Sequence, residues 1–245
     1  MAADVHSLQP IGAKPEPLVE IVFGIIHDAI VRKDLKPGSR VSEAKLAAQL
    51  NVSKTPVREA LLRLEGIGLV VPDGNRGTRV VWPSAENIQH AFEVRALLEG
   101  RSASRAAEHA GLPAQGELRR LAEESLKRAE VGDGDGFREL DQQLHAAIAA
   151  AAGNDVLKRL VDNAYTLTWA LRRRETPSIG YQVGCAHEHL RIVAAIIDHD
   201  PAAAEAEMTR HVDKTRRFVL AHFSGAEDQG PQQQGTARPE RSRGE

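Results

Sequence analysis

Asn51–Leu64, with the sequence NVSKTPVREALLRL, is the stretch that decides the fold of this 245-residue chain. Ser53 is a good helix N-cap, because its hydroxyl can accept a hydrogen bond from a backbone N–H of the first turn. Pro56 falls in that first turn, where its missing N–H costs least. Apolar side chains then recur at helical spacing, namely Val57, Ala60, Leu61 and Leu64. The stretch therefore predicts an amphipathic helix with one buried face.

The opposite face of this predicted helix is rich in hydrogen-bond donors. They are Lys54, Thr55, Arg58 and Arg63. The N-terminal end of a helix already favours anions through its free N–H groups and its dipole. Such a helix is often only a solvated surface element, but it also suits a DNA major groove entered by the N-terminal end.

The neighbouring segments favour the DNA-binding interpretation. Ser42–Leu50 predicts a short helix capped by its first residue, and its distance from the next helix is typical of a helix-turn-helix. Two β-rich runs, Gly68–Pro72 and Thr78–Trp82, flank the basic, glycine-rich Asp73–Gly77, which predicts a hairpin wing. Together these segments predict a winged helix-turn-helix.

The motifs in these segments resemble the DNA-binding domain of the GntR family of bacterial transcription regulators. The matching motifs are Pro37–Glu43, Val52–Leu61 and Arg76–Val80. The resemblance implies that four residues at the start of the recognition helix contact the operator, Ser53, Lys54, Thr55 and Arg58. It also implies that the wing tip reaches the minor groove through Asn75, Arg76 and Gly77.

Two positions depart from the family pattern. Lys54 stands where many members have Arg, so a bidentate guanine contact becomes a point-charge contact. Ala44 replaces an Arg that some members use on DNA, so that contact is absent or is moved to Lys45. The operator sequence therefore does not transfer from the family.

The composition is that of an ordinary soluble globular protein, with 27% charged and 42% hydrophobic residues. The net charge is −2, and residues 1–82 hold 11 Lys and Arg against 9 Asp and Glu, so DNA binding must depend on local placement of charge. The single cysteine, Cys185, excludes an intramolecular disulfide and fits a reducing compartment. No apolar run is long enough for a membrane span and no signal-peptide pattern is present, so we expect a cytoplasmic protein.

We expect four segments along the chain: a flexible arm over 1–15, the winged helix-turn-helix over 16–82, an all-helical domain over 83–224 and a disordered tail over 225–245. Trp82 is expected to pack between the two domains. Helical patterns lie near 17–34, 85–110, 113–131, 134–152, 154–174, 179–199 and 201–223. Alanine-rich helices of this kind form antiparallel bundles, so the predicted fold class is mainly α with a small β-hairpin wing.

Phe92–Gly100 resembles the opening of the FCD effector domain, which defines the FadR-like branch of the GntR family. This likeness covers nearly all of residues 85–222. Together with the winged helix, the resemblance extends over most of the chain.

Four residues of the helical region form a candidate metal site. Asp141 and His145 are four residues apart on one predicted helix, so their side chains share a face. His189 and His211 are each 11 residues from the turn at Asp200, so an antiparallel hairpin places them at the same height inside the bundle. Three imidazoles and a carboxylate facing inward could hold Zn²⁺ or a similar ion, with positions open for water or a ligand.

A histidine on an apolar face is more often an ordinary core residue than a metal ligand. For any one of these three histidines alone, the core role would be favoured. Three at matching depth beside a carboxylate favour a metal. The FCD resemblance also implies that the matching residues are metal ligands, with Zn²⁺ expected and Ni²⁺ or Mn²⁺ as alternatives. His187 is two residues from His189 and points to another face, so it is only a reserve ligand.

Arg95 lies on an inward stripe with Ile88, Phe92 and Glu99. A buried Arg needs an anion, which is either Glu99 or Asp141 in an ion pair, or the carboxylate of a small organic acid. FCD members commonly bind such acids, so Arg95 and Glu99 are the candidate effector-binding residues.

The combined prediction is a homodimeric transcription regulator, more often a repressor, whose affinity for a palindromic double-stranded DNA operator is set by a small organic acid. Two alternatives stay open: a regulator with a metal-free effector pocket, and a metal-dependent hydrolase. The hydrolase would have only Glu188 or Glu99 as a general base, and a DNA-binding domain would be superfluous to it. We therefore expect no catalytic residues and no enzyme.

Overall fold

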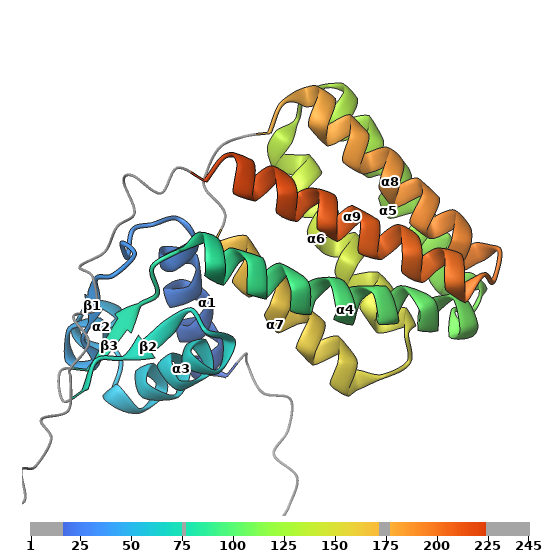
Figure 1. Ribbon diagram of the computed structural model, residues 1–245. Coiled ribbons are helices and arrows are strands. Elements are labelled where there is room, and N and C mark those ends of the chain that lie inside the picture. Colours follow the sequence, from blue (N-terminus) through green and yellow to red (C-terminus); the bar gives the residue numbers. More distant parts are fainter. Residues whose placement is uncertain (1–16, 75–76, 172–176, 224–245) are drawn as a thin grey trace, which may run out of the picture.

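The computed structural model describes residues 17–74, 77–171 and 177–223. The predicted arm over 1–15, the tail over 225–245 and the wing-tip residues Asn75 and Arg76 lie outside the described residues. Within them the chain forms two parts that differ in architecture, a small α/β part and a larger helical part (Figure 1).

The N-terminal part has the element order expected for a winged helix-turn-helix. Its elements are α1 (Leu18–Val31), β1 (Arg40–Val41), α2 (Glu43–Leu50), α3 (Lys54–Ile67), β2 (Val70–Pro72) and β3 (Thr78–Val80). The apolar face predicted for α3 is buried against α1 and the sheet, since Val57, Ala60 and Leu64 are each 0% exposed. Burial of this apolar face leaves the opposite face of α3 exposed to solvent.

The turn between α2 and α3 follows from local backbone preferences. Ser42 Oγ accepts a hydrogen bond from the backbone N–H of Lys45, which caps α2. Asn51 ends α2 in the left-handed region with φ of 52°, a conformation that Asn tolerates better than most residues. Ser53 stands at the N-cap of α3 as predicted, but its side chain makes no capping hydrogen bond, so that part of the prediction is wrong.

The wing is a three-stranded antiparallel sheet in the order β1-β3-β2. Strand β3 pairs with β2, with Val70 opposite Val80, and on its other edge with β1. The hairpin was predicted from the sequence, but β1, which is only two residues long, was not. The indole of Trp82 lies against Gly38 of the N-terminal part, where a Cβ atom would overlap it, and the expected packing of Trp82 between the domains stays a prediction.

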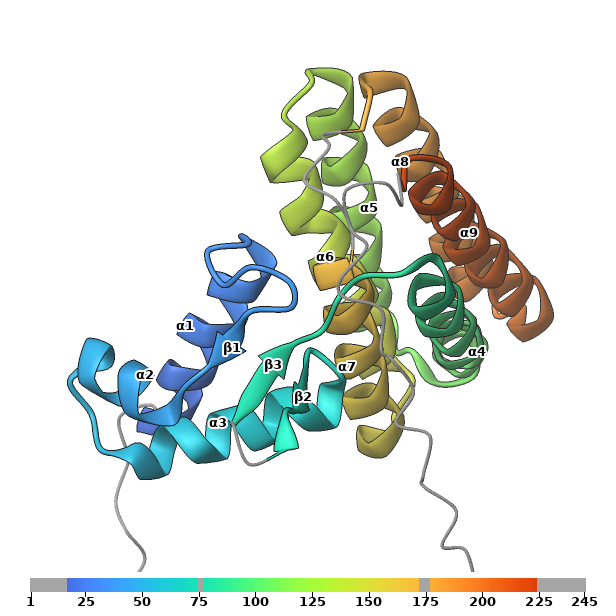
Figure 2. The same cartoon turned by 60° about the vertical axis from the view of Figure 1, so that its left-hand side comes forward.

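The described residues of the C-terminal part form six helices. They are α4 (Ala85–His109), α5 (Leu112–Glu130), α6 (Gly134–Ala151), α7 (Asp155–Leu171), α8 (Ile179–Ile197) and α9 (Pro201–Ala221). Helix α4 packs along α9 and also contacts α6, α7 and α8, while α5 packs against α6 and α8 (Figures 1 and 2). The bundle core is formed by apolar side chains from all six helices. The mainly α fold class is confirmed.

Local sequence sets where these helices begin. Ser84 Oγ accepts from Asn87 N at 3.0 Å and begins α4, and Asp200 Oδ1 accepts from Ala203 N at 2.9 Å and begins α9. Pro201 then occupies the first turn of α9, where its missing N–H costs least. No helix among the described residues is long and apolar enough to cross a membrane.

Helix α7 joins the two parts. Its side chains Leu167 and Ala170 pack against the apolar core of the N-terminal part, and Leu167 also contributes to the core of the bundle. A pocket of about 540 Å³ lies between α3, the sheet, α4 and α7. A displacement of α7 would therefore act directly on the packing of the N-terminal part.

Candidate metal centre and nucleic-acid interface

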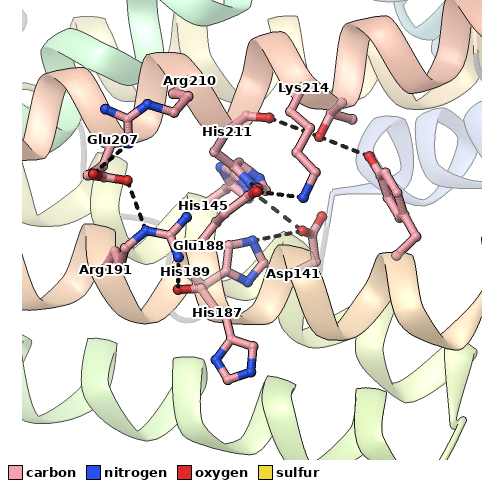
Figure 3. Close-up of polar contacts among 12 residues, drawn as sticks. Asp141, His145, His187, Glu188, His189, Arg191, Glu207, Arg210, His211 and Lys214 are labelled. Atoms are coloured by element: carbon pink, nitrogen blue, oxygen red, sulfur yellow. Dashed lines mark hydrogen bonds and ion pairs between the residues drawn. The ribbon is translucent and has the colours of Figure 1, made fainter.

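The fold brings the four predicted metal ligands together. Asp141 and His145 come from α6, His189 from α8 and His211 from α9, and one ligand atom of each lies within 4.8 Å of those of the others. Asp141 Oδ1 is 3.2 Å from His189 Nε2 and 3.8 Å from His145 Nε2. All four residues are buried, and Figure 3 shows their side chains converging between α6, α8 and α9.

The geometry follows from the two spacings noted in the sequence. Four residues separate Asp141 from His145, which places both on the inner face of α6. The hairpin of α8 and α9 brings the rings of His189 and His211 to a centroid distance of 4.7 Å. The centroid of the His145 ring lies 5.3 Å from that of His211.

The Nδ1 atom of each of the three clustered histidines contacts a polar side chain on a different helix. His211 Nδ1 lies 2.9 Å from Glu188 Oε2, and His189 Nδ1 lies 3.4 Å from Ser125 Oγ. His145 Nδ1 is hydrogen-bonded to Glu99 Oε2. Such outer partners fix the tautomer and the ring orientation of metal-binding histidines. This role of Glu188, Ser125 and Glu99 was not predicted from the sequence.

The opposite nitrogen atoms fit a metal ion. His145 Nε2 and His189 Nε2 are buried and have no hydrogen-bond partner in the described part of the chain, which is costly for a polar atom unless a ligand satisfies it. Three imidazoles and one carboxylate are a donor set typical of Zn²⁺, and they also suit Ni²⁺ or Mn²⁺. The residues present therefore fit a divalent cation.

The protonation states also suit a metal. Burial lowers the pKa of His211 to about 4, so its ring is neutral at pH 7 and has a lone pair for coordination. Glu188 carries its charge because the hydrogen bonds from His211 and Lys214 hold its pKa below the usual value, although burial opposes this. Burial likewise opposes ionisation of Glu99, but the charge of Arg95 and the contact with His145 hold its pKa at about 2.

Arg95 is buried and has an anion within the chain. Its Nε lies 2.5 Å from Glu99 Oε1, and its Nη1 lies 3.3 Å from Thr168 Oγ1. The guanidinium carbon is 4.4 Å from the centroid of the Tyr165 ring, a cation–π arrangement. Of the two alternatives left open by the sequence, these contacts favour the ion pair with Glu99.

Tyr165 connects the candidate metal centre to α7. Its hydroxyl donates to Asp141 Oδ2 at 2.6 Å, while Asp141 Oδ1 faces the histidines. Three residues further along α7, Thr168 accepts the hydrogen bond from Arg95. Polar contacts from α7 thus reach both Asp141 and the Arg95–Glu99 pair.

A second group of possible ligands shares His211 with the first. It consists of Cys185, Glu188 and His211, whose ligand atoms also lie within 4.8 Å of one another. Lys214 Nζ already binds Glu188 Oε1 at 2.5 Å, so a cation there would meet an ammonium group. Burial also raises the pKa of the Cys185 thiol to about 12, which disfavours the thiolate needed for coordination. The first group is therefore the better candidate.

His187 is exposed and points away from the other histidines in Figure 3. Its ring faces outward because it is two residues from His189 on the same helix. The structure thus offers no support for its use as a reserve ligand.

The second candidate site is the exposed edge of the helix-turn-helix. Five of the residues predicted to contact DNA are exposed to solvent. Lys45 lies on α2, Ser53 is the N-cap of α3, and Lys54, Thr55 and Arg58 lie in the first turns of α3. Gly77, at the base of the wing tip, is also exposed, with φ of 97°. Arg58 is bound to Glu43 by hydrogen bonds from Nε and Nη2.

An ionic cluster holds the base of the wing. Asp73 Oδ2 accepts from Arg40 Nε at 2.7 Å and from Arg79 Nη2 at 2.9 Å. Loss of hydration opposes ionisation of Asp73, but the two guanidinium groups hold its pKa below the usual value. Arg79 also donates to the carbonyl of Gly38. These bonds tie β1 to β3 at the surface beside α3.

Comparison with known proteins identifies both parts of the chain. Residues 18–80 match the family of bacterial regulatory proteins called the gntR family, and residues 90–214 match the FCD domain. The Nta operon transcriptional regulator of Aminobacter aminovorans is 30% identical over 202 residues, covering 79% of this chain and 85% of the relative. The probable D-xylose utilization operon transcriptional repressor of Paenarthrobacter nicotinovorans is 31% identical over 199 residues, 81% of this chain and 87% of the relative.

Solved structures agree with the fold. The Escherichia coli protein McbR/YncC superposes with a TM-score of 0.71 at 20% identity, over 86% of this chain and 100% of that chain. A putative GntR regulator from Rhodococcus sp. RHA1 gives a TM-score of 0.63 at 24% identity, over 84% of this chain and 99% of that chain. The relatives named above are regulators and not enzymes. With a winged helix-turn-helix that binds DNA and an FCD domain that takes an effector, the chain belongs to the GntR family of transcription regulators, in its FCD-containing branch.

Proposed function

We propose that this regulator binds a palindromic operator as a homodimer, acts as a repressor, and releases DNA when a small organic acid binds beside a divalent metal ion in the FCD domain. The observation that carries the proposal is the buried cluster of Asp141, His145, His189 and His211. The Nε2 atoms of His145 and His189 face Asp141 Oδ1 and have no hydrogen-bond partner among the described residues. Such an arrangement has a polar interior that an ordinary bundle core would avoid.

The DNA contacts would come from the exposed residues at the start of α3. Lys54 and Thr55 lie in the first turn, where backbone N–H groups and the helix dipole attract phosphate, and Arg58 lies one turn further along. Lys45 on α2 and the wing tip from Asn75 to Gly77 would add contacts to the backbone and the minor groove. Two copies related by a two-fold axis would present two such surfaces to two half-sites.

The acid would bind at the metal. A bound divalent ion supplies a positive centre with affinity for a carboxylate. Asp141 and the three histidines would hold the ion, with Glu99, Ser125 and Glu188 orienting the rings from behind. Direct contact of Arg95 and Glu99 with the acid remains a prediction, and their mutual ion pair supports a role in holding His145.

Helix α7 is the proposed route from this site to the DNA-binding part. Tyr165 contacts Asp141 and Thr168 contacts Arg95, while Leu167 and Ala170 on the same helix pack against the N-terminal core. A ligand that changes the position of Asp141 would therefore bias the position of α7. Allosteric coupling of this kind typically amounts to ~1–3 kcal/mol, or a ~5–150-fold change in operator affinity.

The test combines elemental analysis of the purified protein with operator binding. The operator is a duplex enriched by the protein itself from a random-sequence pool, and its dissociation constant is measured with and without EDTA and a panel of small carboxylic acids. We expect about one Zn²⁺ per chain and weaker operator binding with at least one acid. The acid effect should disappear after EDTA treatment and return when Zn²⁺ is restored.

Two results would count against parts of the proposal. An acid effect that survives complete removal of metal would favour the alternative of a metal-free effector pocket. Operator binding can also be measured at concentrations at which the protein is monomeric. If the bound fraction there rises linearly with protein concentration, the proposal that the protein binds its operator as a homodimer is contradicted.

A further inference from the structure

We infer that Glu43 is a specificity-determining residue of the DNA-binding surface, because it holds the guanidinium group of Arg58 in a fixed orientation for base recognition. This inference rests on the proposed role of Arg58 as a DNA contact. Glu43 carries the same sign of charge as DNA, and the family motifs do not imply a DNA contact for it.

The contact bridges the two helices of the helix-turn-helix. Glu43 is the first residue of α2, and Arg58 is the fifth residue of α3. Arg58 Nε lies 3.1 Å from Oε1 and 3.2 Å from Oε2 of Glu43, and Arg58 Nη2 lies 2.9 Å from Oε2. Both side chains are exposed enough to face a DNA duplex, at 61% for Arg58 and 35% for Glu43.

The remaining edge of Arg58 suits a base or a phosphate. A guanidinium group has five N–H donors in one plane, which form two edges that can each make a bidentate contact. Glu43 uses the edge formed by Nε and Nη2, so the edge formed by Nη1 and the second N–H of Nη2 is left. In the described part of the chain no hydrogen bond involves Arg58 Nη1. A bidentate contact of Arg with guanine O6 and N7 needs one such edge.

The carboxylate has two opposing effects on DNA binding. Holding Arg58 in one orientation reduces the side-chain entropy that is lost on binding, which favours the correct sequence. The negative charge near the phosphates disfavours every sequence equally, because phosphate contacts carry no sequence information. Only the first effect increases the ratio of specific to non-specific affinity, because the second lowers both affinities by the same factor. An exposed ion pair with no function in recognition would leave this ratio unchanged.

The test uses the full chain with the substitution Glu43→Gln. Dissociation constants are measured for the duplex selected by the wild-type protein and for a scrambled duplex, over a range of salt concentrations. We expect non-specific binding to become equal or tighter, operator binding to become weaker, and the ratio of the two affinities to fall about tenfold. Equal changes for both duplexes would overturn the inference.

Glu20→Gln is the matched control. Glu20 on α1 pairs with Arg63 on α3 at 2.7 Å, with side-chain exposures of 44% and 45%, so this variant removes an equal charge from another exposed ion pair that involves α3. Arg63 also lies over the ring of Phe23 on α1, which positions it without Glu20. The control should change the two affinities by the same factor. A tenfold loss of specificity in this variant too would overturn the inference.

A double-mutant cycle separates positioning from direct contact. If Glu43 acts through Arg58, Glu43→Gln should have no effect on specificity in a protein that already carries Arg58→Ala. If Glu43→Gln lowers specificity by the same factor in the Arg58→Ala protein, Glu43 contacts DNA directly. That result would overturn the inference but not the proposed function. If Arg58→Ala leaves operator affinity unchanged, Arg58 is not a DNA contact, and that part of the proposed function fails with it.

Discussion

Replacing Glu99 with glutamine should destabilise the protein by about 3 kcal/mol and weaken its hold on a metal ion. Glu99 is 1% exposed, and its two carboxylate oxygens accept hydrogen bonds from Arg95 Nε and His145 Nδ1. Glutamine has nearly the same shape but no charge. The substitution therefore leaves the guanidinium group of Arg95 buried without its anion.

Two independent routes give the size of this effect. Glu99 has a pKa of about 2 in place of the ordinary 4.5, which corresponds to ~3 kcal/mol in favour of its charged form. Removing one partner of a buried ion pair generally costs ~3–5 kcal/mol. Because the pKa is lowered by folding, this contribution is fully present above pH 4.5 and is lost only as the pH falls toward 2. The free energy of unfolding at pH 7 therefore includes the whole contribution of the Glu99 charge.

The assay is urea denaturation at pH 7 of the EDTA-treated protein, followed by metal titration of the folded protein. Glu93→Gln on the same helix is the control, since its side chain is 53% exposed and its contacts with Gln89 and Arg216 are those of a surface pair worth ~0–1 kcal/mol. Glu99→Gln should also weaken metal affinity ~10–100-fold, the usual effect of losing an outer partner of a metal-binding histidine. A loss of stability no larger than that of the control would refute the reasoning.

Three further outcomes are expected. Tyr165→Phe should reduce stability by ~1.5–3 kcal/mol, because the hydroxyl bond to Asp141 is lost, and should reduce the effect of EDTA on operator binding in gel-shift assays. Cys185, whose pKa is raised to about 12 by burial, should react with a thiol reagent at pH 8 only after unfolding, and rapid reaction of the native protein would contradict its packing. Gly100→Ala should cost ~1–3 kcal/mol in denaturation, because the new Cβ atom would lie 2.6 Å from Thr209 Oγ1 of α9, and adding Thr209→Ala should restore part of the loss.

The positions of the helices could be predicted well from the sequence, because their boundaries depend on local chemistry. Ser42 caps the helix that it was expected to cap, and Ser84 and Asp200 cap α4 and α9 in the same way. Strand β1 was not predicted, because two residues hold too little pattern and its pairing with β3 joins residues about 40 positions apart. The contact of Trp82 with Gly38 was not predicted for a similar reason, since nothing local indicates that Gly38 leaves room for the indole.

The four inward-facing residues of the candidate metal centre could be predicted from register alone. An i, i+4 pair and two positions equally distant from a tight turn define their heights in the bundle before any packing is known. Their outer partners have no such regularity. Glu99 is 46 residues from His145, and Ser125 is 64 residues from His189, on helices whose neighbours are decided by the whole bundle. Glu188 was considered as a general base, and its bond to His211 gives it a different role.

Arg95 illustrates how packing decides between two chemically sound predictions. A buried guanidinium group needs an anion, and from the sequence a chain carboxylate and an acid ligand are equally suitable. In the structure Glu99 is one helical turn away on α4, so its carboxylate has a high effective concentration beside Arg95 and already accepts from Nε. A ligand would have to displace this carboxylate, which would also remove the partner of His145. Discrimination between acids should therefore depend mainly on side chains around the histidines, and Arg95→Lys should alter stability more than it alters which acid binds.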